Sequence, residues 1–292
     1  MARETNSPSA ARRTRGYGLG KVDTVLAVDE VARQAAQLAD GAPDATALNA
    51  LCRGDAMLAL DNLVAGYGTM QILHGLDLRV GAGQSLCLIG PNGAGKSTVL
   101  HAIYGFATVM SGSIRMSGSE IAGLTASDKL KRAGIAYILQ DSSIFPGMSV
   151  EENLWMGGYL MDRPAEARIA AERVFERYPR LAERRHQQAR VLSGGERRLL
   201  EISRALVMEP KLLLVDEPSI GLEPRYIDMV FDILRELQEK DGKTIVMVEQ
   251  NARKGLEFAD IGYVLVSGLL ALAGRGADLL DNPDVGRLFL GG

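Results

Sequence analysis

The sequence contains few of the residues and patterns that mark several specialised classes of protein. Its 292 residues include only two cysteines, Cys52 and Cys87, which lie far apart and lack the spacing of a metal site. We interpret both as reduced thiols of a cytosolic protein, because small secreted domains carry cysteines in dense sets. The 33 basic and 36 acidic residues leave a formal net charge of -3, so there is no basic excess of the kind that binds nucleic acid.

No uninterrupted apolar run is long enough to cross a membrane. The longest candidate, YVLVSGLLALAG, is broken by Ser267 and Gly268 and is shorter than the roughly 20 residues that a spanning helix needs. The N-terminal stretch MARETNSPSAARRTRGYGLGK has no apolar core of the signal-peptide kind. We therefore expect no membrane span and no secretory signal, and a solvated leader at the N-terminus.

The character of the sequence changes near Met57, which divides the chain into two predicted parts. In residues 22–51 apolar and alanine side chains recur at near-helical spacing, so one amphipathic helix would fit this stretch. Met57 is also a possible initiator. Residues 1–56 are therefore either a disordered or partly helical N-terminal extension or a stretch that is not translated, whereas residues 57–292 are expected to form one globular domain.

From Met57 onward, strand-like and helix-like patterns alternate. MLALDNLVAGYG alternates apolar and polar residues as a half-buried strand does, and KLLLVDEP is a continuous apolar run of the kind that is buried on both faces of a parallel sheet. Helical patterns lie between such runs, among them PAEARIAAERVFERY and GGERRLLEISRALVM. This order predicts an α/β fold whose early strands pair antiparallel.

The stretch GPNGAGKST, residues 90–98, matches the phosphate-binding pattern G-x-x-x-x-G-K-[ST]. It follows the apolar run SLCLIG and opens a helical pattern, which is the context that a phosphate loop needs. Its glycines let successive N–H groups point into one concavity, Lys96 can reach the β- and γ-phosphates of ATP, and Ser97 offers a hydroxyl to Mg²⁺. An ordinary glycine-rich turn would not require a lysine followed by hydroxyl residues at these positions. The predicted nucleotide-contacting residues of the loop are Gly90, Pro91, Asn92, Gly93, Ala94, Gly95, Lys96, Ser97 and Thr98.

Two carboxylates at the end of the run LLLVDEP supply groups that the phosphate loop lacks. Asp216 can hold Mg²⁺ directly or through water, and Glu217 can polarise the attacking water as a general base. An isolated Asp-Glu pair would indicate no more than a solvated strand end. The assignment therefore depends on the phosphate loop upstream.

Between these motifs, the stretch LSGGE at residues 192–196 opens a helical pattern. Ser193 and Glu196 fit a capping box, and Gly194 and Gly195 leave the helix N-terminus accessible to an anion. A chain with a single phosphate loop has no evident use for a second phosphate cradle. This motif therefore predicts a partner.

With these motifs in order, with Gln140 at the end of IAYILQ and with SIGLEP after the carboxylates, residues 57–292 resemble the ATP-binding-cassette (ABC) ATPases. LSGGE together with a phosphate loop is highly specific for that family. The resemblance implies a P-loop NTPase fold with a mixed sheet and RecA-like core, an antiparallel β subdomain and an α-helical signature subdomain. It also implies that two cassettes pair head to tail, so that ATP bound to one phosphate loop is covered by Ser193, Gly194, Gly195 and Glu196 of the other.

The resemblance also implies roles for single residues. Tyr67 matches the aromatic residue that stacks on adenine, Gln140 the glutamine that contacts Mg²⁺ and the attacking water and couples to the membrane subunit, and Glu217 the catalytic base. Two positions depart from the broad pattern: Glu223 stands for the D-loop aspartate, and Gln250, in TIVMVEQNA, for the switch histidine. A glutamine amide donates a hydrogen bond but cannot ionise, so we expect Gln250 to sense the γ-phosphate and position water.

Within the family, the chain is most similar to the LivF-type ATPases of branched-chain amino-acid importers. The blocks that carry this similarity are AGIAYILQ, IFPGMSVEENLWMG, VEQNA and DVGRLFLGG. The similarity implies a sister cassette, or a second copy of this chain, together with two transmembrane permease subunits and an external solute-binding protein. It implies a peripheral location at the cytoplasmic face of the inner membrane. The DSS that follows Gln140 departs from the basic residues common there, on the surface that faces the permease.

Three other hypotheses stay open from the sequence. Urea and amide importers use very similar cassettes. A soluble cassette ATPase that acts on ribosomes or DNA is disfavoured, because such proteins typically duplicate the cassette or insert a long coiled coil, and this chain has one cassette and no heptad run. A cassette that binds ATP without hydrolysing it conflicts with Glu217, although Gln250 leaves that hypothesis open.

Overall fold

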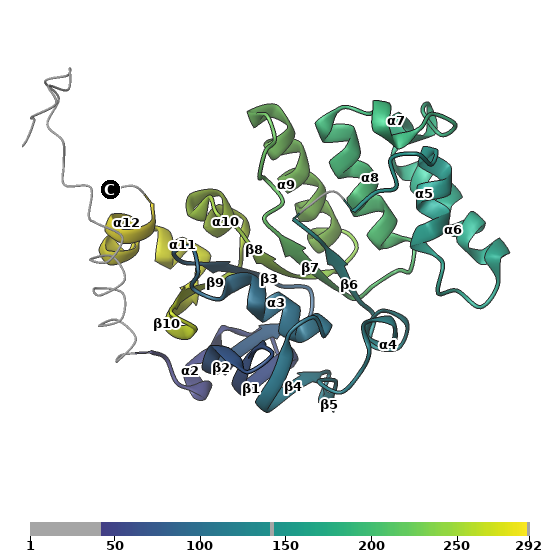
Figure 1. Ribbon diagram of the computed structural model, residues 1–292. Helices are drawn as coiled ribbons and strands as arrows, with labels where there is room; N and C mark the ends of the chain where they lie inside the picture. Colours follow the sequence, from purple (N-terminus) through teal and green to yellow (C-terminus); the bar gives the residue numbers. More distant parts are fainter. Residues whose placement is uncertain (1–41, 141–142, 291–292) are drawn as a thin grey trace, which may run out of the picture.

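The computed structural model describes residues 42–140 and 143–290, which form two sheets surrounded by helices (Figure 1). Most of the predicted N-terminal extension, residues 1–41, lies outside the described residues. Within the described part of the chain, no helix combines the length and the apolar character that spanning a bilayer requires.

A six-stranded sheet forms the centre of the molecule. The strands follow the order β10, β9, β3, β8, β7, β6, and β10 alone runs antiparallel to its neighbour. They are β3 (Ser85–Ile89), β6 (Ile135–Ile138), β7 (Leu212–Asp216), β8 (Thr244–Val248), β9 (Ile261–Val266) and β10 (Leu269–Arg275). The carboxyl ends of the parallel strands meet at one edge of the sheet, which is where ligands bind in α/β proteins.

Successive side chains of the inner strands enter two separate cores. On β3, Leu86 and Leu88 belong to the core beneath the sheet, whereas Cys87 and Ile89 belong to the core above it. Every residue of β3, β7, β8 and β9 is buried. Burial on both faces explains why these strands are continuously apolar rather than alternating.

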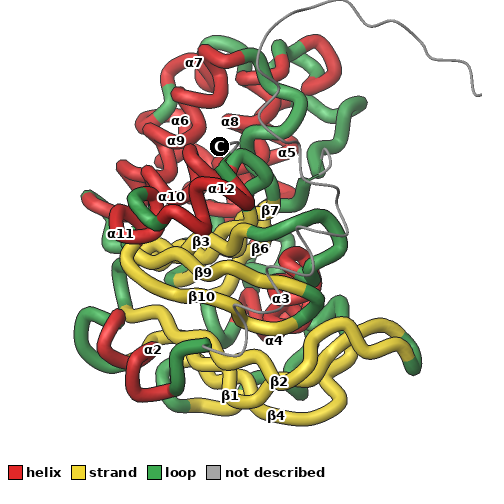
Figure 2. Tube along the Cα trace, turned by 90° about the vertical axis from the view of Figure 1, so that its left-hand side faces the viewer, coloured by secondary structure: helices red, strands yellow, loops and turns green. Residues whose placement is uncertain are grey.

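The second sheet is antiparallel and has the order β2, β1, β4, β5. Its strands are β1 (Ala56–Tyr67), β2 (Met70–Gly81), β4 (Thr108–Met116) and β5 (Ser119–Glu120). Helix α3 (Lys96–Tyr104) lies between the two sheets, as Figure 2 shows, and packs Val99, Leu100 and Ile103 into the core that they share.

The remaining helices lie mainly on the opposite face of the six-stranded sheet (Figure 2). They are α5 (Val150–Gly157), α6 (Pro164–Arg177), α7 (Pro179–Ala182), α8 (Gly194–Leu206), α9 (Pro224–Glu239), α10 (Ala252–Phe258), α11 (Gly276–Leu280) and α12 (Pro283–Phe289), with α4 (Ala126–Lys131) leading into β6 and a 3-10 turn at Ala189–Val191. Helices α5 to α7 form a group beside α8 at the right of Figure 1. The predicted architecture of a mixed sheet, an antiparallel subdomain and a helical subdomain is confirmed.

The short helix α2 (Ala45–Leu51) precedes Met57 and packs against β2 and β10. Asp44 caps it by accepting a hydrogen bond from the backbone N–H of Ala47 at 2.8 Å, and residues 42–44 are not helical. The interpretation of residues 22–51 as one helix is therefore wrong at its C-terminal end, because Pro43 and the Asp44 cap begin a separate helix. The division of the chain at Met57 stays a prediction.

Substitution of Leu48 tests whether α2 belongs to the folded core. Leu48 is fully buried, so Leu48→Ala is expected to lower the free energy of unfolding by about 2–5 kcal/mol through the cavity that it leaves. Asn49→Ala, at an exposed position of the same helix, should change it by less than about 0.5 kcal/mol. Urea unfolding of both variants measures the difference. Equal midpoints would show that α2 contributes nothing to the core.

Candidate nucleotide-binding site

The loop between β3 and α3 is shaped by two glycines. Gly90 has a φ of 146°, and a Cβ at this position would lie 2.1 Å from the carbonyl oxygen of Leu265. Gly95, at a φ of 93°, is the N-cap of α3 and contributes no side-chain cap. The first turn of this nine-residue helix therefore presents uncapped N–H groups and the positive end of its dipole to the loop. This geometry suits a bound phosphate.

Lys96 is the first residue of α3, and its side chain reaches back to the start of the loop. Its side chain is buried, and its ammonium group donates hydrogen bonds to the carbonyl oxygens of Gly90 at 2.9 Å and Pro91 at 3.0 Å. Burial lowers the pKa of Lys96, while the carboxylates of Glu217 and Asp216 act in the opposite direction. Phosphate oxygens can replace the two carbonyl oxygens as acceptors, and they offer the ammonium group a full charge as partner.

Asp216 ends β7 and meets two hydroxyl groups. The Ser97 hydroxyl donates to its Oδ1 at 3.1 Å, and the Tyr137 hydroxyl donates to its Oδ2 at 2.8 Å. Mg²⁺ is commonly held by one or two carboxylates and by substrate phosphates, with oxygen ligands throughout, so Ser97 and Asp216 fit this ion. The described residues contain no cluster of three or more His, Cys, Asp or Glu side chains that would hold a metal without substrate.

Glu217 adopts a backbone conformation that is rare for its residue type. Its φ of 41° lies in the left-handed region, and its backbone N–H donates to the carbonyl oxygen of Val248 at 2.9 Å. The side-chain amide of Gln140 donates to Glu217 Oε2 at 3.1 Å. Burial, followed by the charge of Asp216, raises the pKa of Glu217, whereas Lys96 opposes this rise. Strain of this kind persists where the surrounding structure requires the orientation, and it is concentrated at functional sites.

Glu217 stands between two cavities. With Lys96, Ser97 and neighbouring loop residues it lines an open cavity of about 390 Å³. With Gln140 and Gly194 it lines a second cavity of about 300 Å³. The structure therefore brings together the phosphate loop, the strand-end carboxylates and Gln140, as the sequence predicted for a single site.

The LSGGE motif lies at the N-terminus of α8 and does not line the cavity of the phosphate loop. The predicted capping box is confirmed: the N–H of Ser193 donates to Glu196 Oε2 at 2.9 Å, and the N–H of Glu196 donates to Ser193 Oγ at 3.3 Å. Glu196 also forms an ion pair with Arg184 at 2.7 Å. A Cβ on Gly195 would lie 2.2 Å from the ring of Tyr226, so a larger residue at this position would displace that ring. Contacts of this motif with nucleotide stay a prediction.

Tyr67 ends β1, and 44% of its surface is exposed. Its hydroxyl lies 2.5 Å from Nδ1 of His101, which is on α3 directly downstream of the phosphate loop. Burial lowers the pKa of His101, which favours the neutral form of the ring in this contact. The contact fixes an exposed aromatic ring relative to the phosphate loop. Stacking of Tyr67 on adenine stays a prediction.

Three residues of the site were not predicted from the sequence: Tyr137, Arg198 and Glu201. Arg198 and Glu201 form a buried ion pair at 2.8 Å on α8. The Arg198 guanidinium also donates to the carbonyl oxygen of Leu139 at 2.9 Å, and the N–H of Ser143 donates to Glu201 Oε1 at 3.3 Å. This pair fixes α8 against the segment that carries Gln140. The amphipathic pattern of α8 places Arg198 and Glu201 on its buried face. Two opposite charges on that face are the signal that would have indicated a buried ion pair.

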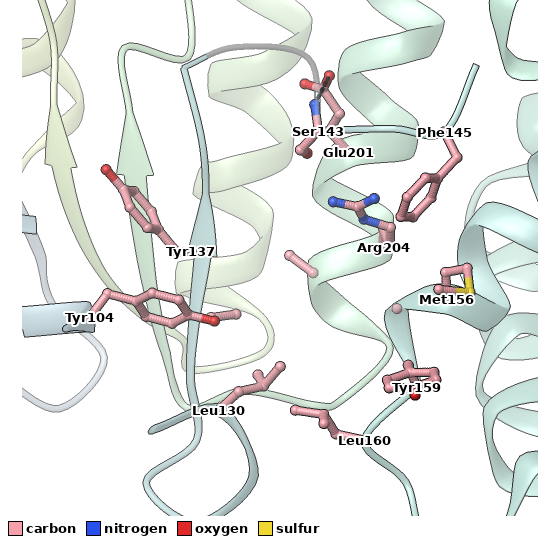
Figure 3. A pocket seen from close by; sticks show the side chains of 13 residues that line it. Tyr104, Leu130, Tyr137, Ser143, Phe145, Met156, Tyr159, Leu160, Glu201 and Arg204 are labelled. Carbon is pink, nitrogen blue, oxygen red and sulfur yellow. Dashed lines mark hydrogen bonds between the residues drawn. The ribbon is translucent and has the colours of Figure 1, made fainter. Parts of the chain in front are cut away.

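A groove of about 310 Å³ lies between β6 and helices α5 and α8 (Figure 3). The rings of Tyr104 and Tyr137 lie on one side, and Phe145, Arg204 and Tyr159 lie on the other. The aromatic side chains Phe145 and Tyr159 are 41% and 76% exposed. Asp141 and Ser142, which begin the DSS departure, lie outside the described residues.

Gln250 lies two residues beyond the end of β8 and is exposed. If it donates a hydrogen bond to the γ-phosphate, Gln250→Ala should lower kcat by about 10- to 100-fold, the effect of one hydrogen bond to a charged group, and leave the Kd for ATP largely unchanged. Arg253→Ala, exposed on α10, serves as the control. Steady-state ATPase assays and nucleotide titration measure both quantities. Unchanged turnover would make Gln250 an ordinary turn residue.

The fold and the site together define a P-loop ATPase whose signature helix lies apart from its own phosphate loop. The family model for ABC transporters matches residues 73–220. The chain belongs to the ABC transporter family, as an ATP-binding cassette that hydrolyses ATP. Cassettes of this family form dimers and pair with the membrane subunits of transporters.

Individual relatives agree with this assignment. The high-affinity branched-chain amino acid transport ATP-binding protein BraG of Pseudomonas aeruginosa is 44% identical over 236 residues, which cover 81% of this chain and 100% of that protein. The probable branched-chain amino acid transport ATP-binding protein LivF of Archaeoglobus fulgidus is 37% identical and covers 80% of this chain and 99% of its own. The crystal structure of a nucleotide-free ATP-binding cassette from an ABC transporter superposes on this chain with a TM-score of 0.72 at 27% sequence identity. The match covers 82% of this chain and 100% of the chain in that structure.

Proposed function

We propose that this chain is the energy-coupling ATPase of an importer for branched-chain or related amino acids. The observation that carries this proposal is the 44% identity to BraG over the whole length of that protein. The site supports the coupling role, because Glu217 lines the cavity of the phosphate loop and also the neighbouring cavity that Gln140 lines, and it accepts a hydrogen bond from Gln140. An importer of urea or amides stays the alternative.

The nucleotide is proposed to be shared between two cassettes. ATP would bind on the loop of residues 90–98, with Lys96 on its β- and γ-phosphates and Tyr67 against adenine. Ser97, Gln140 and Asp216 would hold Mg²⁺, which neutralises phosphate charge when bound. Glu217 would take the proton of the attacking water, oriented by Gln140 and Gln250. The nucleotide of the partner would be covered by Ser193, Gly194, Gly195 and Glu196. The separation of α8 from the phosphate loop of its own chain supports this arrangement.

The partners are proposed to be a sister cassette or a second copy, two permease subunits and an external solute-binding protein. The aromatic groove of Figure 3 supports a permease contact, because the exposed rings of Phe145 and Tyr159 line it together with Ser143, three residues after Gln140. An aromatic-lined groove of this kind suits the apolar face of a helix from a permease loop. The chain would then lie at the cytoplasmic face of the inner membrane as a peripheral subunit.

Uptake measurements test the substrate. Deletion of the gene should abolish high-affinity uptake of radiolabelled leucine, isoleucine and valine, and expression of the wild-type chain should restore it. Expression of a Glu217→Gln variant should not, because transport requires hydrolysis. Loss of urea uptake with intact leucine uptake would establish the alternative, and intact uptake of all these solutes would contradict both.

A further inference from the structure

The buried carboxylate of Glu249 has no role in the site described so far. Glu249 follows β8, immediately before Gln250, and is 1% exposed. Its Oε2 has no hydrogen-bond partner among residues 42–140 and 143–290. A buried carboxylate with an unsatisfied oxygen costs free energy, so a position that keeps one calls for an explanation other than stability.

The other oxygen of this carboxylate joins two segments of the site. Glu249 Oε1 accepts hydrogen bonds from the Ser219 hydroxyl at 2.7 Å and from the backbone N–H of Asn251 at 2.9 Å. Ser219 lies two residues after Glu217, in the turn that leads to Glu223. Asn251 follows Gln250 and caps α10, where its Oδ1 accepts from the N–H of Lys254 at 3.1 Å.

No basic side chain of the described residues forms an ion pair with Glu249. Gly255 packs closely beside Glu249 and Cys87: a Cβ on Gly255 would lie 2.6 Å from Cys87 Sγ and 3.1 Å from Glu249 Cβ. Two hydrogen bonds to one oxygen are therefore the contacts that the charge makes. They connect the residues on either side of Gln250 to the turn after the catalytic carboxylate.

We propose that Glu249 is a positioning residue that fixes the Ser219 turn and the Gln250 segment relative to each other, so that Glu217 and Gln250 face the nucleotide together. This inference rests on the proposed roles of Glu217 and Gln250 in hydrolysis. It does not depend on which solute is transported. Glu249 itself touches neither nucleotide nor water in this role.

Two substitutions at Glu249 separate a positioning role from a packing role. Glu249→Leu fills the space but removes both accepted hydrogen bonds. Glu249→Gln keeps an acceptor oxygen for Ser219 and Asn251 and removes only the charge. Glu257→Leu, at an exposed position of α10, is the matched control. The readouts are kcat, KM for ATP, the Kd for ATP and the urea midpoint of the full-length chain.

Glu249→Leu should lower kcat by roughly 10- to 100-fold, because it removes the two hydrogen bonds to the Glu249 carboxylate that position the Ser219 turn and the Gln250 segment. It should leave the Kd for ATP within about threefold, because neither hydrogen bond involves the nucleotide. Glu249→Gln should retain kcat within about threefold, and its urea midpoint should match or exceed that of the wild type. Ser219→Ala should lower kcat less than Glu249→Leu, and the double variant should show no additional loss.

Three results would overturn the inference. Wild-type turnover in Glu249→Leu would make the residue a packing element. An equal loss in Glu249→Gln and Glu249→Leu would assign the effect to charge rather than to the hydrogen bonds. Loss of ATP binding in parallel with kcat would place Glu249 in the binding pocket. Failure of the proposed hydrolytic roles is recognised separately, because Glu217→Gln and Gln250→Ala would then turn over normally.

Discussion

Glu217→Gln is expected to lower ATP turnover by about 10²- to 10⁴-fold while ATP binding persists, because the amide cannot accept the proton of the attacking water. The substitution is isosteric, so the left-handed backbone at residue 217 and the position of the side chain beside Gln140 should be unchanged. The carbonyl oxygen of the new amide can still accept from Gln140. The loss should therefore fall on chemistry and not on assembly of the site.

Single-turnover hydrolysis and equilibrium binding of ATP, measured on the same preparation, separate the two effects. The variant should also accumulate a dimer with nucleotide enclosed, which size-exclusion chromatography in the presence of ATP would detect. Glu239→Gln, at the exposed C-terminal end of α9, is the control for the loss of a carboxylate charge away from the site. Rapid hydrolysis by Glu217→Gln would assign the base elsewhere.

Lys96→Ala is expected to weaken ATP binding by about two orders of magnitude, because it removes a charge-assisted contact to the β- and γ-phosphates. In the described structure the ammonium group also bridges the carbonyl oxygens of Gly90 and Pro91. The variant therefore loses both the charge and a crosslink of the loop. Turnover should fall at least as far as binding.

Isothermal titration with ATP tests this loss, and Lys240→Ala, at an exposed lysine on the far end of α9, is the control. Thermal unfolding of both variants without nucleotide measures the stability lost with the loop crosslink separately from the loss of ATP affinity. Normal affinity and normal turnover in Lys96→Ala would refute the assignment of residues 90–98 as the phosphate site.

The motifs of the site were predictable because each lies in one continuous stretch. GPNGAGKST specifies a loop and a helix start, and the LSGGE capping box is complete within four residues, Ser193 to Glu196. The continuous apolar strands followed from burial on both faces. Local stereochemistry and the period of the pattern are sufficient for such features.

The contacts that orient the site were not predictable, because they join residues that are distant in sequence. The bond from Tyr137 to Asp216 spans 79 positions, and the bond from Ser219 to Glu249 spans 30. The packing of α2 was missed for another reason: its Ala-rich face buries one large residue, Leu48, whose partners lie on distant strands. The positions of such residues depend on the order of strands in the sheet, which no single motif specifies.

The most direct test of the shared-site mechanism is the ATPase rate per chain, measured against protein concentration, alone and with the sister cassette and permease subunits in proteoliposomes. The dilute chain should hydrolyse ATP weakly, and the rate should rise with concentration and again when the partners are added. A full rate from a dilute monomer, unchanged by partners, would contradict a site completed by the LSGGE motif of a second cassette.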